Sequence, residues 1–272
     1  MIGALIIVFR EMIEACLIVG IVMAATQTVS GSRKWIAGGI LAGIFGSCIV
    51  AAFTGTIAQL FNGFGQEIFN AVILAIAVAM LTWHNIWMAR NGRALAGELK
   101  QAGIEVREGH KSLLALAIIV GTAVLREGSE VVLFLYGIAI SAHETAFGMI
   151  AGGVVGLALG AIVSALTFRG LLKIPTRYFF SVTSWLIAFL AAGMAAQSVS
   201  FLEKAGLVEI LQNTVWNSSG VLSEGSIAGR VLHTLIGYSD QPTALQLLVY
   251  LATLTIGFGL TKWVGRPRMA AA

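Results

Sequence analysis

The chain carries little charge for its length. Only 11% of its 272 residues are Asp, Glu, Lys or Arg, whereas soluble domains carry about 25%. So low a content excludes an ordinary soluble enzyme, and the high apolar content excludes a disordered chain. The formal net charge of +4 is explained better by loops that flank membrane spans than by a nucleic-acid-binding surface. We therefore expect no nucleic-acid partner.

Proline and cysteine are also scarce. The three prolines, Pro175, Pro242 and Pro267, fall between or after the apolar segments, where a helix breaker interrupts no helix. Cys16 and Cys48 lie in apolar runs without a CxxC or Cys/His spacing, so neither a zinc site nor a redox pair is predicted. The N-terminal apolar run has no basic region before it and no small-residue cleavage site after it, and this predicts a retained helix rather than a signal peptide.

Apolar residues, by contrast, make up 58% of the chain. A helix needs about 20 residues to cross a hydrocarbon core of about 30 Å. Seven apolar segments are long enough, at residues 2–27, 35–61, 67–89, 112–140, 146–172, 178–202 and 244–264. The sequence therefore predicts an all-α integral membrane protein, a single permease domain over residues 1–272 that lies in the lipid bilayer with seven transmembrane helices.

Basic residues are distributed unevenly between the two sides of this arrangement. Thirteen of them, from Arg33 to Arg268, fall on one side, and the other side holds only Lys204 and Arg230. The positive-inside rule then predicts a cytoplasmic-membrane protein with its N-terminus outside and its C-terminus in the cytoplasm. Residues 91–111 become a cytoplasmic loop with a short amphipathic helix over 91–108, and residues 203–243 become an outer segment that dips back towards the bundle.

Two charged clusters interrupt the apolar segments, and both read R-E-x-x-E. The first is Arg10-Glu11-Met12-Ile13-Glu14 and the second is Arg126-Glu127-Gly128-Ser129-Glu130. A charged side chain at the centre of a membrane helix costs about 2.5–3.5 kcal/mol, so these side chains are expected to face the bundle interior. Helical spacing puts the three charges of each motif on neighbouring positions of one face.

The charges of the two motifs do not cancel. Four carboxylates and two guanidinium groups leave a formal net charge of −2, which protons or a bound cation would balance, and carboxylate oxygens suit hard cations. Buried ion pairs that only hold the bundle together are the alternative. A single Arg–Glu pair would fit that alternative, but two extra buried carboxylates would be very costly without a partner.

The position of the motifs predicts an internal repeat. They lie 116 residues apart, in the first and fourth spans, which cross the membrane in opposite directions. The chain thus divides into repeat one (1–90), repeat two (112–202) and a seventh helix (244–264). The glycine-rich stretches 38–43 and 152–157 support this division. Inverted repeats are typical of transporters whose site lies near the midplane where the halves meet.

Paired RExxE motifs in the first and fourth of seven spans resemble the high-affinity iron permeases, also called oxidase-dependent iron transporters, which include the fungal ferric and the bacterial Efe-type permeases. Segments 81–88, 191–195 and 237–238 are also similar to that family. The usual family motif is R-E-G-L-E. The chain differs from it only at spacer positions, which read Met12-Ile13 in the first motif and Gly128-Ser129 in the second.

The resemblance implies an iron permease and not an enzyme. Iron, expected to be ferric after oxidation or delivery by an extracytoplasmic partner protein, would be the transported substrate, and no cofactor is expected. The implied metal-binding residues are Glu11, Glu14, Glu127 and Glu130, with Arg10 and Arg126 balancing their charge.

Other functions remain open at this point. A permease for another metal, such as lead or manganese, would use the same carboxylates. A membrane-bound metalloenzyme is disfavoured because di-iron carboxylate sites usually add Glu-x-x-His pairs, and none lies in the apolar segments. A sensor or scaffold with a degenerate site is disfavoured because every charged position of both motifs is intact.

A few further polar and aromatic residues carry weaker predictions. His84 is expected to lie near the cytoplasmic surface rather than to bind metal, with Trp83, Trp87 and Trp263 in an aromatic belt. Glu67 and the pair His143-Glu144 are expected at outer helix ends, where they would help ions to enter. Residues 197–200 would either line a path or hold helices together.

Overall fold

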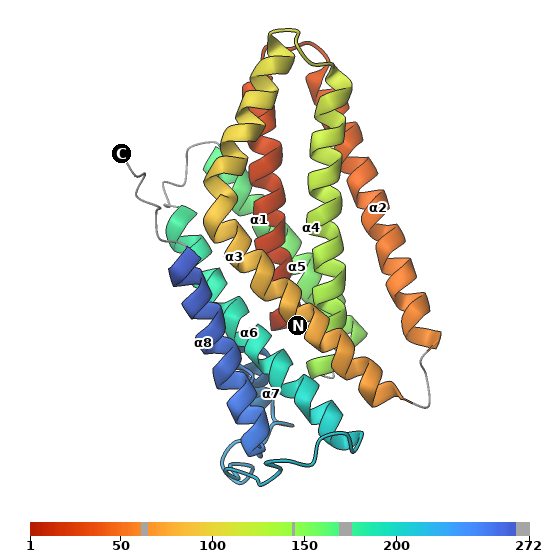
Figure 1. The fold of residues 1–272 in the computed structure, drawn as a ribbon. Helices are drawn as coiled ribbons and strands as arrows, with labels where there is room; N and C mark the ends of the chain where they lie inside the picture. Colours follow the sequence, from red (N-terminus) through yellow and green to blue (C-terminus); the bar gives the residue numbers. More distant parts are fainter. Residues whose placement is uncertain (61–64, 143–144, 169–175, 265–272) are drawn as a thin grey trace.

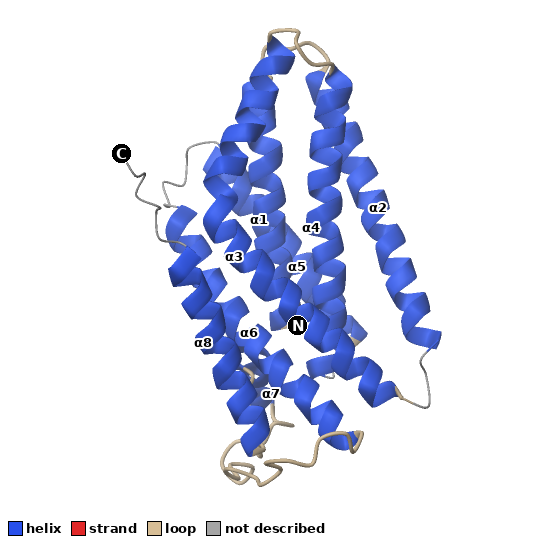
Figure 2. Ribbon diagram, viewed as in Figure 1, coloured by secondary structure: helices blue, strands red, loops and turns tan. Residues whose placement is uncertain are grey.

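The computed structural model describes residues 1–60, 65–142, 145–168 and 176–264, and it is a bundle of helices joined by loops (Figures 1 and 2). Its described residues contain no β-strand, only one isolated bridge between Thr214 and Thr243. The helices are α1 (Ile2–Ala25), α2 (Ser32–Leu60), α3 (Gln66–Arg107), α4 (Leu113–Ala142), α5 (Ala146–Phe168), α6 (Thr176–Lys204), α7 (Ile227–Ile236) and α8 (Ala244–Val264).

The long helices match the apolar segments of the sequence, and four contain stretches long and apolar enough to cross a membrane. These stretches are Ser32–Thr54, Gln66–Met88, Ala146–Phe168 and Val182–Lys204. Helices α1 and α4 are also long and continuous, but each contains the three charged residues of an RExxE motif within its apolar sequence. The fold is therefore that of an all-helical membrane protein.

Helix α3 is longer than its apolar segment. The sequence ends the span at residue 89 and predicts a separate short helix over 91–108. These residues are helical to Arg107, but they continue α3 without a break. Residues 91–107 contain no proline and many good helix formers, so charge marks where the apolar stretch ends and not where the helix ends. Leu99 and Val106 bury this extension against residues of α1, α2 and α4. Gly109, with φ +80°, follows the end of the helix.

Two pairs of helices pack closely through glycines. Helix α2 lies against α4, and α5 lies against α1 (Figure 1). A Cβ atom on Gly43 of α2 would come within 2.8 Å of the backbone oxygen of Gly121, and one on Gly156 of α5 would come within 2.6 Å of the backbone oxygen of Leu5. Small residues at these contacts let the helix backbones approach each other.

Two buried apolar clusters lie on either side of the charged motifs. The first cluster contains Ile7, Leu81 and Phe134 and joins α1, α3, α4 and α6. The second cluster contains Ile18 and Val120 and joins α1, α2, α3 and α4. Along α1 the first motif falls between residues 7 and 18, and along α4 the second motif falls between residues 120 and 134. The charged residues therefore form a polar layer between two apolar layers.

The segment between α6 and α8 returns to the bundle, as the sequence predicts. Helix α7 packs against α6 and also contacts α1 and α4. Ser226 caps its first turn by accepting a hydrogen bond from the Gly229 amide at 3.0 Å. Gly237 ends the helix with φ +69°, and a Cβ on Gly193 of α6 would come within 2.6 Å of the Cα of Gly237.

Candidate metal site

The two RExxE motifs meet inside the bundle, with the first on α1 and the second on α4. One ligand atom from each of Glu11, His84, Glu127 and Glu130 lies within 4.8 Å of the other three. Residues separated by more than one hundred positions in sequence thus form one compact group. The structure brings three of the four predicted carboxylates into this group, and it adds a histidine from α3.

In the first motif, Arg10 is paired with both glutamates. Its Nε atom lies 2.9 Å from Oε1 of Glu14, one helical turn further on, and its Nη1 atom lies 3.5 Å from Oε1 of Glu11. The Arg10 side chain is only 2% exposed. The charged side chains of this motif are therefore buried inside the helix bundle.

The second motif repeats these pairs in a more open setting. Arg126 Nη2 lies 3.2 Å from Oε1 of Glu127, and its Nε lies 3.4 Å from Oε1 of Glu130. The Arg126 side chain is 38% exposed. Its guanidinium lies over the ring of Trp87, 4.7 Å from the centroid, and 3.9 Å from the sulfur of Met88.

His84 of α3 joins the two motifs. Its Nε2 lies 3.2 Å from Oε2 of Glu14, and its Nδ1 lies 2.5 Å from Oε2 of Glu130. The expectation that this histidine lies at the membrane surface is wrong. Helix α3 runs on to Arg107, and His84 is buried at the level of both motifs. The available signal was a lone ionisable residue in an apolar segment, which is a candidate functional residue by default.

The cluster has more negative than positive charge. Four glutamates and two arginines leave a formal net charge of −2 when the imidazole is neutral. Both carboxylate oxygens of Glu11 and both of Glu127 are buried and have no hydrogen-bond partner among the described residues. Buried carboxylates in this state are costly, and their oxygens are the donors that a hard metal cation binds. The arrangement can therefore hold a cation, and a cation would stabilise it.

Of the other residues suggested by the sequence, Trp87 lies beside Arg126, whereas Ser198 and Glu67 are not part of this cluster. Ser198 donates a buried hydrogen bond to the backbone oxygen of Ala71 at 2.8 Å, so it links α6 to α3 instead of lining a path. Glu67 is exposed in the first turn of α3. His143 and Glu144 lie outside the described residues, as does the side chain of Trp263.

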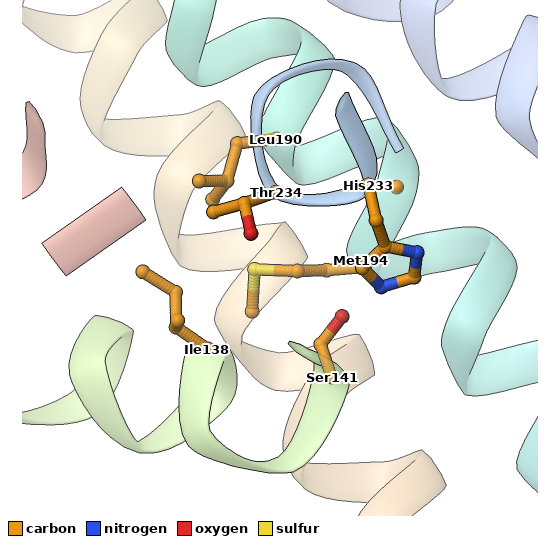
Figure 3. A pocket seen from close by; sticks show the side chains of 7 residues that line it. Ile138, Ser141, Leu190, Met194, His233 and Thr234 are labelled. Atoms are coloured by element: carbon orange, nitrogen blue, oxygen red, sulfur yellow. The ribbon is translucent and has the colours of Figure 1, made fainter. Parts of the chain in front are cut away.

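A small pocket lies at the contact of α4, α6 and α7 (Figure 3). It has room for roughly one water-sized particle. Its lining residues are Ile138, Ser141, Leu190, Gly193, Met194, His233 and Thr234. His233 Nδ1 lies 2.8 Å from the Tyr238 backbone oxygen and 3.2 Å from Oε1 of Glu224. No RExxE residue lines the pocket, so it is separate from the metal-site cluster.

Apolar helices around buried ionisable residues define a multi-pass membrane protein. The family model described as the iron permease FTR1 family matches residues 1–265, so the chain belongs to the FTR1 iron permease family. This confirms the family that the paired motifs indicated, and it identifies the protein as a permease of the iron-transport class.

Curated relatives carry names that agree with this family. The chain is 30% identical over 275 residues to proteins named "Ferrous iron permease EfeU" from Shigella sonnei (strain Ss046) and Escherichia coli O157:H7, with 98% of each chain covered. It is 30% identical over 249 residues to the protein of the same name from Yersinia pestis, covering 90% of this chain and 87% of the relative. No solved structure matches the chain.

Proposed function

We propose that this permease imports iron across the cytoplasmic membrane through the buried cluster formed by its two RExxE motifs. The observation that carries the proposal is the meeting of both motifs in one layer, with the carboxylate oxygens of Glu11 and Glu127 buried and without hydrogen-bond partners. Glu11, Glu14, Glu127 and Glu130 form the anionic wall of the site. Arg10 and Arg126 balance that charge when no ion is bound.

Seven helices, α1 to α6 and α8, are the proposed membrane spans, with the N-terminus outside and the C-terminus in the cytoplasm. The proposed division into two inverted repeats is supported by the glycine contacts. Gly43 of α2 packs on Gly121 of α4, and Gly156 of α5 packs on Leu5 of α1. Leu5 and Gly121 are 116 residues apart, the same separation as Arg10 and Arg126. An inverted repeat of this kind suits a site at the midplane.

The two apolar clusters act as barriers in this mechanism. An ion in the polar layer is separated from one side by the cluster around Phe134 and from the other by the cluster around Val120. Transport then requires the clusters to open in turn, as in other transporters built from inverted repeats. Each opening exposes the charged layer to one side of the membrane while the other cluster stays packed.

The proposed ion is ferrous iron. The formal charge of −2 from four glutamates and two arginines equals the charge that Fe²⁺ neutralises, and the relatives are named ferrous iron permeases. This replaces the ferric ion expected from the oxidase-dependent resemblance. An extracytoplasmic partner that oxidises or delivers iron stays a prediction, and lead and manganese are the competing ions.

Uptake into proteoliposomes tests the proposal. We expect radiolabelled Fe²⁺, kept reduced, to enter faster than ferric citrate and to be weakly inhibited by Mn²⁺ or Pb²⁺. Glu127→Gln should abolish uptake, whereas the exposed Glu98→Gln on the extension of α3 serves as a matched control and should transport normally. Equal uptake by wild type and Glu127→Gln at equal protein content would refute the proposed site.

A further inference from the structure

We infer that His84 is a ligand of the transported ion, together with Glu11, Glu127 and Glu130, and that Glu14 is a positioning residue and not a ligand. This inference rests on the proposed function of the site. It assigns unequal roles to the four RExxE glutamates, and it brings a nitrogen donor from α3 into a site that otherwise offers only oxygen.

The positions of the ligand atoms support this choice. The four atoms that lie within 4.8 Å of one another belong to Glu11, His84, Glu127 and Glu130, and Glu14 is not among them. One oxygen of Glu14 is held by the Nε of Arg10 at 2.9 Å, and the other lies 3.2 Å from Nε2 of His84. Both oxygens of Glu14 therefore have a close nitrogen neighbour. In Glu11 the nitrogen neighbours are more distant, with Arg10 Nη1 at 3.5 Å from Oε1 and His84 Nε2 at 3.9 Å from Oε2.

The contacts of His84 resemble a common arrangement in metal proteins. A metal-bound histidine usually donates its other ring N–H to a carboxylate, which fixes the ring and its tautomer. Here Nε2 donates to Glu14, and this leaves Nδ1 to bind the ion. Arg10 holds Glu14, Glu14 holds His84, and His84 holds the ion. The Arg10 side chain is only 2% exposed, so this supporting chain is protected from water.

Glu130 is the ligand that has to move. Its Oε2 lies 2.5 Å from Nδ1 of His84, and an ion that binds both atoms at about 2.0–2.2 Å needs them further apart. Glu130 is also the least buried carboxylate of the cluster, at 12% exposed, beside the partly exposed Arg126. The ion therefore takes the place of the direct contact between Glu130 and His84, and the emptied site closes again through that contact.

A nitrogen ligand has a consequence for selectivity. Imidazole suits iron and later transition metals, whereas sites built from oxygen alone suit magnesium, calcium and manganese. His84 therefore raises the preference of the site for Fe²⁺ over Mn²⁺ and Ca²⁺. His84→Glu keeps a potential ligand but makes it an oxygen, so we expect this variant to lose at least tenfold in the ratio of Fe²⁺ to Mn²⁺ uptake.

The direct test uses Mn²⁺ as a paramagnetic probe on the purified full-length chain. Electron spin echo spectra of the bound Mn²⁺ should show ¹⁴N modulation from a directly bound imidazole, and Fe²⁺ should displace the ion. His84→Gln should lose the modulation and bind Mn²⁺ more weakly. His110→Gln, at an exposed histidine outside the cluster, should keep both properties.

Glu14→Gln separates the two glutamate roles. This substitution removes a carboxylate that orients the metal-bound histidine, so it should weaken Mn²⁺ binding about 10–100-fold. The ¹⁴N modulation should remain at saturating Mn²⁺, because His84 is still a ligand. Loss of all binding in this variant would overturn the positioning role.

The inference and the proposed function fail in different ways. Bound Mn²⁺ without ¹⁴N modulation, in a wild-type protein whose binding is abolished by Glu127→Gln, would overturn the role of His84 and leave the carboxylate site standing. Absence of both Mn²⁺ and Fe²⁺ binding in the wild type, or binding unaffected by Glu127→Gln, would overturn both. If His84→Gln keeps the circular dichroism spectrum and the thermal midpoint of the wild type, its loss of ¹⁴N modulation is due to the missing ligand and not to unfolding.

Discussion

The two RExxE motifs have the same charged residues in the same spacing, but they occupy different surroundings. Arg10 is 2% exposed and is paired within its own helix. Arg126 is 38% exposed and lies over Trp87. Helix α3 contacts the motifs unequally, because His84 reaches a glutamate of each motif whereas Trp87 lies beside the second motif alone. In the proposed mechanism, the first motif would therefore be the fixed half of the site, and the second motif would be the half that opens.

The largest effects are expected where the two motifs are alike. Glu11 and Glu127 occupy the same position in each motif, and each has two buried oxygens without hydrogen-bond partners. Glu11→Gln and Glu127→Gln should each lower Fe²⁺ uptake at least a hundredfold, because either change removes a charge from the same ion site. Uptake measured at matched protein content checks this, and a variant that keeps more than a tenth of wild-type uptake would break the comparison.

The next effect should separate the motifs. Arg10→Gln leaves the buried Glu14 and Glu11 without their cation, and breaking a buried ion pair in this way costs about 3–5 kcal/mol. Arg126→Gln removes a less buried group, so its cost should be smaller than that of Arg10→Gln. Thermal unfolding in detergent should therefore show a much larger loss of stability for Arg10→Gln. Equal losses would mean that the two arginines have equivalent surroundings.

The glycine contacts should be affected equally, since they repeat on both sides of the bundle. Gly43→Val and Gly156→Val each push a side chain into a backbone oxygen, and overpacking costs about 1–3 kcal/mol. Gly38→Val is the matched control because no atom of another helix lies within 4 Å of the position of its Cβ. If unfolding shows a loss at only one of the two contacts, the repeat does not describe the packing.

The smallest effect concerns the aromatic ring beside Arg126. Trp87→Leu removes a cation–π contact worth about 1 kcal/mol and leaves the carboxylates in place. We expect a modest fall in stability with Fe²⁺ uptake reduced less than tenfold. Trp83→Leu, at an exposed position on the same helix, should change neither quantity. A complete loss of uptake in Trp87→Leu would show that Arg126 has a larger role than charge balance.

The sequence was sufficient to predict the long helices and the burial of RExxE carboxylates inside the bundle. Long apolar runs and the cost of intramembrane charge determine both, and these are properties of a segment by itself. The extent of α3 could not be predicted in the same way, because helix-forming residues continue past the end of its apolar stretch.

The place of His84 could not be predicted either, since it depends on how α3 crosses α1 and α4. The unequal exposure of Arg10 and Arg126 likewise depends on neighbours far away in sequence, such as Trp87. Two segments with one local pattern thus acquire different environments through the packing of a third helix.

The central claim is that both motifs form one cation site, and the stoichiometry of binding tests it most directly. Purified protein should bind one Fe²⁺ per chain under anaerobic equilibrium dialysis, and Glu11→Gln and Glu127→Gln should each bind none at the same free concentration. Two ions in the wild type, with one retained in either variant, would show that each motif binds separately and would contradict the account.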